Sequence, residues 1–129
     1  MQFHHIGYLI ENMADGIEAF KKLGYKIEKD PVLDGSRQVE ICFLSGPTKV
    51  ELIVPTKECK LFKSLQDKIG NGPYHICYNS DDIEADIISL KNAGWLQISK
   101  VEPAIAIDNR YVVFFFSKDI GIIEIVSMK

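Results

Sequence analysis

The sequence predicts an α+β fold made of two βαβββ modules, and three observations lead to this prediction. His5 and His75 each begin the same short phrase, in which His and Ile are followed by one further residue and Tyr. Counted onward from these histidines without gaps, the two stretches also share an isoleucine, a lysine, a glycine and an aromatic residue. Each stretch ends in an apolar run that contains one glutamate, Glu51 and Glu124. Internal repetition of this kind predicts two copies of one structural unit.

The first copy covers about residues 1–56. Residues 2–10 have strand character, and Asn12 is the expected N-cap of the helix that follows, whose apolar residues recur every three or four positions. Gly24 is suited to end that helix because glycine adopts positive φ most easily. Three strand-like runs complete the copy: 24–29, 38–44 and 48–54.

The second copy covers about residues 73–129 and has the same order of elements. Asp81 and Glu84 have the spacing of a capping box, and Gly94 is the expected helix end. The strand-like runs after the helix are 95–101, 110–116 and 121–127. Residues 57–69 carry a helical apolar stripe and form a linker helix between the modules, so that residues 1–129 are expected to make a single domain.

Composition narrows the class of protein. The net charge is −3 and the hydrophobic fraction is 47%, which predicts an ordinary soluble protein without affinity for nucleic acid or for an anionic membrane surface. Three cysteines are dispersed without CxxC spacing, at positions 42, 59 and 77. They are typical of reduced thiols, so we expect a cytoplasmic protein.

One histidine and one glutamate recur at matching places in the two copies. A carboxylate inside an apolar strand must find solvent, a partner or a metal to offset its desolvation. If the copies pair about a pseudo-twofold axis, His5, Glu51, His75 and Glu124 converge. Two imidazoles and two carboxylates suit a divalent ion such as Zn²⁺, Ni²⁺ or Co²⁺. Each of the four taken singly is also compatible with an ordinary polar residue, and the duplicated placement favours the metal site. His4 has no counterpart in the second copy and is expected to be structural.

Four phrases of the chain resemble a known superfamily: His5-Ile6-Gly7, Val50-Glu51-Leu52-Ile53-Val54-Pro55, Gly72-Pro73-Tyr74-His75-Ile76-Cys77 and Gly121-Ile122-Ile123-Glu124-Ile125. They look like the vicinal oxygen chelate superfamily, and within it most like the methylmalonyl-CoA epimerases, then glyoxalase I (lactoylglutathione lyase). The resemblance implies paired modules whose curled mixed sheet surrounds one divalent ion (Zn, Ni, Co or Mn). It places the four ligands at His5, Glu51, His75 and Glu124, and it favours a homodimer.

The predicted activity is that of a metal-dependent isomerase or epimerase acting on a small molecule. Such an enzyme removes a proton next to a carbonyl or thioester while the metal stabilises the enolate. The first alternative is glyoxalase I. The second is a drug-binding resistance protein of the same fold without catalysis, although a complete set of four ligands argues against it.

A carboxylate base is needed beside the reacting carbon, and Glu40 is the first candidate. In its strand, Val39, Ile41 and Phe43 share one face, and Glu40 and Cys42 share the other. If the apolar face covers the helix, Glu40 points toward the metal. The resemblance also implies a catalytic glutamate in this strand. The alternative is a solvated glutamate at a sheet edge.

Glu124 is the second candidate base, because members of the family that the chain resembles use a ligand glutamate in proton transfer. The sequence leaves four questions open. These are which glutamate acts, which metal binds, whether the substrate is a coenzyme A thioester, a glutathione hemithioacetal or another compound, and whether the site forms within one chain or across a dimer.

Overall fold

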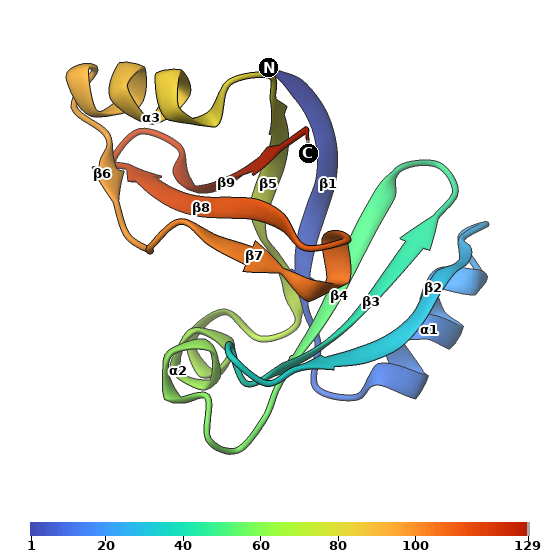
Figure 1. Ribbon diagram of the computed structural model, residues 1–129. Coiled ribbons are helices and arrows are strands. Elements are labelled where there is room, and N and C mark those ends of the chain that lie inside the picture. The colour runs from blue at the N-terminus through green and yellow to red at the C-terminus, as the bar shows by residue number, and fades with distance from the viewer. Residues whose placement is uncertain (129) are drawn as a thin grey trace. The chain divides into compact units, whose positions relative to one another are not determined.

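The computed structural model describes residues 1–128, which divide into two compact units (Figure 1). The N-terminal unit is His5–Tyr74, and the C-terminal unit is Met1–His4 together with the chain from His75 onward. The α+β fold class is as the sequence predicts, and so is the order βαβββ of the first half, whereas the second half has the strand β7 (Glu102–Ala104) and a 3₁₀ helix inserted into that order.

The N-terminal unit places one helix against a four-stranded mixed sheet. Its elements are β1 (Gln2–Leu9), α1 (Met13–Lys21), β2 (Lys26–Asp34), β3 (Val39–Ser45), β4 (Lys49–Pro55) and α2 (Lys60–Ile69). The strand order is β2-β3-β4-β1, in which β1 and β4 are parallel and the other pairs are antiparallel. The linker helix therefore begins three residues later than the predicted 57.

The C-terminal unit repeats this pattern with one insertion. Its elements are β5 (Gly72–Ser80), α3 (Ile83–Asn92), β6 (Leu96–Gln97), β7 (Glu102–Ala104), a 3₁₀ helix η1 (Ile105–Ile107), β8 (Arg110–Ser117) and β9 (Gly121–Ser127). The strand order is β5-β9-β8-β6, with β7 also paired to β8. Strands β5 and β9 are parallel, as β1 and β4 are.

Local signals set the ends of the helices. Asn12 caps α1 as predicted, since its side chain accepts a hydrogen bond of 2.9 Å from the Asp15 amide. For α3 the cap is Asp82, which accepts from the Ala85 amide at 3.1 Å, so the predicted capping box at Asp81 is wrong by one residue. Gly24 and Gly94 both have φ above +90° and end the helices as predicted.

The edge strands differ most from the predictions. Strand β2 runs to Asp34, beyond the predicted 24–29, and pairs with β3 through two irregularities. The sequence does not indicate the full length of β2, because the strand is mostly exposed and carries charges and Pro31, as is typical of edge strands. The predicted strand 95–101 is reduced to β6, and β7 was not predicted at all.

Each unit has an apolar core on one face of its sheet. In the N-terminal unit the core consists of Ile10, Ile17, Cys42, Leu44, Val50 and Leu52, with Met13 and Phe20 of α1 packed against it. In the C-terminal unit it consists of Val113, Phe115, Ile123 and Ile125, with Ile83, Ile87 and Leu90 of α3 packed against it. A helix thus covers one face of each sheet, and the opposite face carries the histidines and glutamates described below.

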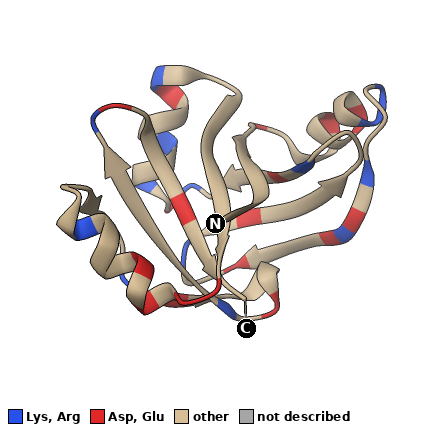
Figure 2. Ribbon diagram, turned by 90° about the horizontal axis from the view of Figure 1, so that it is seen from above, with Lys and Arg blue, Asp and Glu red and all other residues tan. Residues whose placement is uncertain are grey.

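Charged residues of both signs are interspersed along the ribbon (Figure 2). Within residues 1–128, none of the helices has the length and apolar character needed to cross a membrane. The three cysteines are buried free thiols.

Candidate functional site: two His–Glu pairs

In the N-terminal unit, a buried histidine and a buried glutamate face each other from neighbouring strands. Parallel pairing sets Gly7 of β1 opposite Glu51 of β4, so His5, two residues earlier, shares the face of Glu51. His5 Nε2 lies 3.3 Å from Glu51 Oε1. His5 is 0% exposed and Glu51 is 4% exposed. The two polar groups are therefore removed from water together.

An aromatic ring completes this arrangement. Phe43 of β3 is directly opposite Glu51, and its ring meets the His5 ring edge to face, with centroids 5.2 Å apart. This contact holds the imidazole against an apolar wall and limits its rotation. The N-terminal unit therefore presents its histidine in one orientation toward the carboxylate.

The C-terminal unit repeats the same three-residue geometry. Cys77 of β5 is opposite Glu124 of β9, and His75 Nε2 lies 3.3 Å from Glu124 Oε1. Phe114 of β8 is opposite Glu124, and its ring is edge to face with His75 at 5.2 Å. His75 is 4% exposed and Glu124 is 1% exposed. The repetition seen in the sequence therefore extends to the packing of side chains.

The spacing within each pair fits a shared metal better than a direct hydrogen bond. A charge-assisted N–H···O bond is usually about 2.7–2.9 Å long, whereas both pairs are at 3.3 Å. Tetrahedral ligands at ordinary Zn–N and Zn–O distances are about 3.3 Å apart. Each of the four residues offers a ligand atom and is buried. The donor set thus fits a divalent ion of borderline softness.

The structure brings the predicted ligands together within each unit: His5 with Glu51, and His75 with Glu124. His4 is buried and remains a structural residue in our interpretation. That the two pairs bind one ion stays a prediction.

The predicted orientation of Glu40 is wrong. Cys42 and Leu44 belong to the core under α1, whereas Phe43 contacts His5 on the opposite face. Strand β3 pairs with β4 without a bulge, so alternation places Glu40 on the face of Cys42. Glu40 therefore lies on the other side of the sheet from Glu51. Both faces of β3 are rich in apolar residues, and apolar character alone did not indicate which face the helix covers.

The thiol of Cys42 supports this placement. Burial raises the pKa of Cys42 to about 11, and the negative charges of Asp30 and Glu40 add to the increase. Glu40 therefore acts electrostatically on the core under α1, and Cys42 stays protonated at neutral pH.

Several residues on the histidine-bearing faces were missed by the sequence analysis. Phe43 and Phe114 are the clearest, and aligning the third strands of the two copies would have found them, since 43 + 71 = 114. Arg110 lies on the face of His75 and is oriented by two acceptors: its Nη2 donates to Asn79 Oδ1 at 2.6 Å, and its Nε donates to the Ser127 carbonyl.

Asp34 is a further buried carboxylate of the N-terminal unit. It is opposite Val39, on the same face as Phe43 and Glu51, and is 3% exposed. Its Oδ1 accepts hydrogen bonds from the Ser36 hydroxyl at 2.8 Å and from the Arg37 amide at 3.3 Å. These bonds tie together the turn between β2 and β3, which is a common structural role for aspartate. Asp34 therefore lies at the end of β2, on the face of the sheet that carries Glu51.

Each half of the chain is a variant of one βαβββ repeat and carries a buried His–Glu pair on its first and last strands, which could hold a metal ion. The chain belongs to the Glyoxalase/Bleomycin resistance protein/Dioxygenase superfamily, whose family model matches residues 2–114. This confirms the resemblance found in the sequence at the level of the superfamily.

Individual relatives are named as epimerases. Over 83 residues the chain is 35% identical to an ethylmalonyl-CoA/methylmalonyl-CoA epimerase of Cereibacter sphaeroides, a match that covers 63% of the chain and only 62% of that protein. Over 123 residues it is 26% identical to the mitochondrial methylmalonyl-CoA epimerase of Homo sapiens, covering 93% of the chain and 69% of that protein. A methylmalonyl-CoA epimerase of Mycobacterium tuberculosis has the same fold, with a TM-score of 0.84 over 98% of the chain and 87% of that structure at 20% identity.

Proposed function

We propose that this protein is a metal-dependent epimerase of a 2-substituted malonyl-coenzyme A thioester. The reaction removes the proton from the carbon between a thioester carbonyl and a carboxylate, and returns a proton to its other face. The observation that carries the proposal is the same buried His–Glu pair, at 3.3 Å, in each of the two units. The names of the relatives supply the substrate class.

The two pairs are proposed to bind one divalent ion. A single pair offers two ligands, and ions of this kind take four or more, so two pairs suit one ion with room for water or substrate. When bound, the ion supplies positive charge beside a substrate oxygen and stabilises the negative charge that develops there. The burial of all four side chains strengthens such interactions by excluding water.

The base is assigned to Glu124, the ligand glutamate that the resemblance indicated. Its carboxylate is buried, and the edge of the Phe114 ring beside His75 keeps the surroundings apolar. Glu51 is the matching carboxylate of the other unit and is the natural partner for the opposite face of the carbon, since epimerisation needs a proton on each side. Glu40 lies on the wrong face of its sheet for either task.

Metal content and substrate turnover test the proposal. Purified protein should contain about one divalent ion per chain by mass spectrometry and should exchange the proton of methylmalonyl-CoA with deuterated water. Turnover of the glutathione hemithioacetal of methylglyoxal in its place would assign the glyoxalase I reaction. Metal-free protein that binds a drug without turnover would assign the resistance-protein alternative.

The homodimer remains a proposal, and so does the choice between a site within one chain and a site shared by two chains. Mixing the inactive variants His5→Ala and His75→Ala decides this question. Partial recovery of activity after mixing requires ligands from different chains in one site. No recovery from a mixture shown to exchange subunits places all four ligands in one chain.

A further inference from the structure

Four apolar side chains of the C-terminal unit form a row on the face of the sheet that carries His75. Leu96 of β6 is opposite Phe116 of β8. Ile98 lies beside Phe114, because its amide donates to the Phe114 carbonyl at 2.9 Å. We call Leu96, Ile98, Phe114 and Phe116 the apolar row. The first two and the last of these are 61%, 46% and 42% exposed, so most of the row is in contact with solvent.

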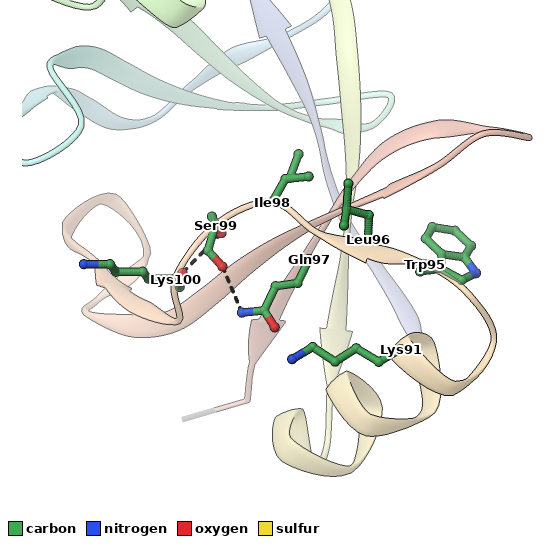
Figure 3. A pocket seen from close by; sticks show the side chains of 7 residues that line it. All are labelled: Lys91, Trp95, Leu96, Gln97, Ile98, Ser99 and Lys100. Atoms are coloured by element: carbon green, nitrogen blue, oxygen red, sulfur yellow. Dashed lines mark hydrogen bonds between the residues drawn. The ribbon is translucent and has the colours of Figure 1, made fainter.

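The segment that carries Leu96 and Ile98 has two different sides (Figure 3). Leu96 and Ile98 extend to one side, whereas Gln97 extends to the other side, where α3 lies, as alternation along a strand requires. A hydrogen bond holds the segment against β8, because Ser99 Oγ accepts from the Phe114 amide at 2.8 Å. The apolar row is therefore fixed on the face of the sheet that α3 does not cover.

One end of the apolar row touches the His75–Glu124 pair. The ring of Phe114 meets the ring of His75 edge to face, with centroids 5.2 Å apart, and Phe114 is opposite Glu124. At ordinary strand spacings, the Cα atom of Phe116 lies roughly 8 Å from that of Glu124, and the Cα atom of Leu96 roughly 12 Å. A group of a few carbon atoms that starts at the pair can therefore extend along the row.

The repeated fold does not require apolar residues at these places. In the N-terminal unit the equivalent positions are polar, since Lys26 is opposite Ser45 and Lys29 is opposite Phe43. The core of the C-terminal unit lies on the other face of its sheet, under α3, so the apolar row does not belong to it. Exposed apolar side chains that adjoin one another commonly mark a surface that a ligand covers.

We propose that the apolar row binds the alkyl substituent of the substrate, and that the preferred substrates are malonyl thioesters with a propyl or longer group on the reacting carbon. This inference rests on the proposed epimerase function and narrows its substrate class. The reacting carbon carries a carboxylate, a thioester, the hydrogen that is removed and the alkyl group, and only the alkyl group matches an apolar surface. Leu96 lies on the edge strand and is exposed, so the row leaves room for a long chain.

A series of chain lengths tests this inference through turnover. Methyl-, ethyl-, butyl- and hexylmalonyl-CoA have the same thioester arm, and exchange of the proton with deuterated water gives kcat/KM for each. We expect kcat/KM for the butyl ester to exceed that for the methyl ester about tenfold, because each additional methylene contributes about twofold when it is partly buried. Equal values, or a preference for the methyl ester, overturn the inference and leave the epimerase standing.

A double variant tests whether the apolar row causes the preference. Leu96→Lys/Phe116→Ser introduces the residues that the N-terminal unit has at the equivalent positions, and should bring the ratio of kcat/KM, butyl ester over methyl ester, down to about one. The matched control is Ile88→Lys/Leu23→Ser, which makes similar changes at exposed apolar residues outside the row and should leave the ratio as in the wild type. A ratio that stays high in the first variant, or that falls equally in both, overturns the inference.

A binding experiment answers the same question without turnover. The probes are 2-butylmalonate and 2-methylmalonate, each titrated into ¹⁵N-labelled full-length protein. We expect 2-butylmalonate to bind about tenfold more tightly and to shift the amides of residues 96–98 and 114–116. Equal affinities, or shifts confined to other residues, overturn the inference. If none of the esters turns over, the epimerase proposal fails, and this titration still decides whether the apolar row binds an alkyl chain.

Discussion

The two units share one side-chain arrangement and differ in what surrounds it. In both, a histidine on the first strand, a glutamate on the last strand and a phenylalanine on the strand between them have the same pairings and nearly the same distances. The sequence offsets are small variations of one spacing, since 5 + 70 = 75, 43 + 71 = 114 and 51 + 73 = 124. The part that would hold an ion is therefore the part that the two halves have in common.

The ends of the two sheets differ in chemistry at equivalent places. Where the C-terminal unit has Leu96, Phe116 and Ile122 opposite one another, the N-terminal unit has Lys26, Ser45 and Lys49. Lys49 is also engaged, because its Nζ lies 3.2 Å from Glu28 Oε1 and sits over the Phe43 ring. This end of the sheet is therefore apolar in the C-terminal unit and charged in the N-terminal unit.

At the opposite end the contrast is reversed. The C-terminal unit has the hydrogen-bonded pair Asn79 and Arg110, whereas the equivalent positions of the N-terminal unit are Leu9 and Val39, both almost fully buried. The comparison teaches that the two halves share the His–Glu pairs, while the residues around these pairs set a different environment in each half. The four predictions below test this view, from the largest expected effect to the smallest.

Removing either histidine tests whether the two pairs serve one ion. We expect His5→Ala and His75→Ala each to lower kcat/KM by about 10³-fold or more and to lose the bound metal, although the pair of the other unit is intact. Metal content by mass spectrometry and the rate of solvent deuterium exchange are measured together, with circular dichroism to show that each variant is folded. A variant that keeps its full metal content would show that one His–Glu pair is enough to bind the ion, and it would contradict a site shared by both pairs.

Cys42 of the N-terminal unit stands where the C-terminal unit has Val113, since 42 + 71 = 113. Its pKa is raised from the ordinary 9.0 to about 11, so the unfolded chain ionises first. The stability due to the protonated thiol is complete below pH 9 and is lost as pH rises to 11, amounting to roughly 2–3 kcal/mol.

Urea unfolding across this pH range checks the prediction about Cys42. The variant Cys42→Val makes the position like that of the C-terminal unit and should abolish this part of the alkaline destabilisation. The difference in unfolding free energy between the two proteins removes the contributions of lysines and tyrosines. A constant difference from pH 8 to pH 11 would contradict the assigned shift.

The hydrogen-bonded pair Asn79 and Arg110 should be replaceable by leucine and valine, the residues at the equivalent positions of the N-terminal unit. Arg110→Val alone leaves the Asn79 carbonyl oxygen without its 2.6 Å donor and should cost about 1–3 kcal/mol of unfolding free energy. The double variant Asn79→Leu/Arg110→Val should recover part of this loss, because both partners are then apolar. Strictly additive losses in urea unfolding would show that the two side chains do not depend on each other.

Glu40→Gln should have the smallest effect. Because Glu40 lies on the α1 face of its sheet, we expect kcat/KM and solvent deuterium exchange to stay within about twofold of wild type. Glu124→Gln is the comparison and should stop the exchange. An exchange rate that collapses in Glu40→Gln, while its metal content is unchanged, would restore Glu40 as the base.

The sequence by itself indicated the repeat and most of the order of elements, and it singled out the four residues that form the two His–Glu pairs. These depend on local signals, such as the cap at Asn12 and the positive φ at Gly24 and Gly94, and on a spacing that repeats between the halves. Such signals can be recognised in the sequence because each acts within a few residues of its own position.

Only the tertiary structure decided which face of a strand meets the helix and which meets the His–Glu pair. Strand β3 alternates between two largely apolar faces, and the choice came from the packing of Cys42 and Leu44 with Ile17 of α1. The extent of β2 and the presence of β7 were likewise decided by pairing with a neighbouring strand. Residues far apart in the chain make these contacts, and an alternating pattern has the same period whichever face is covered.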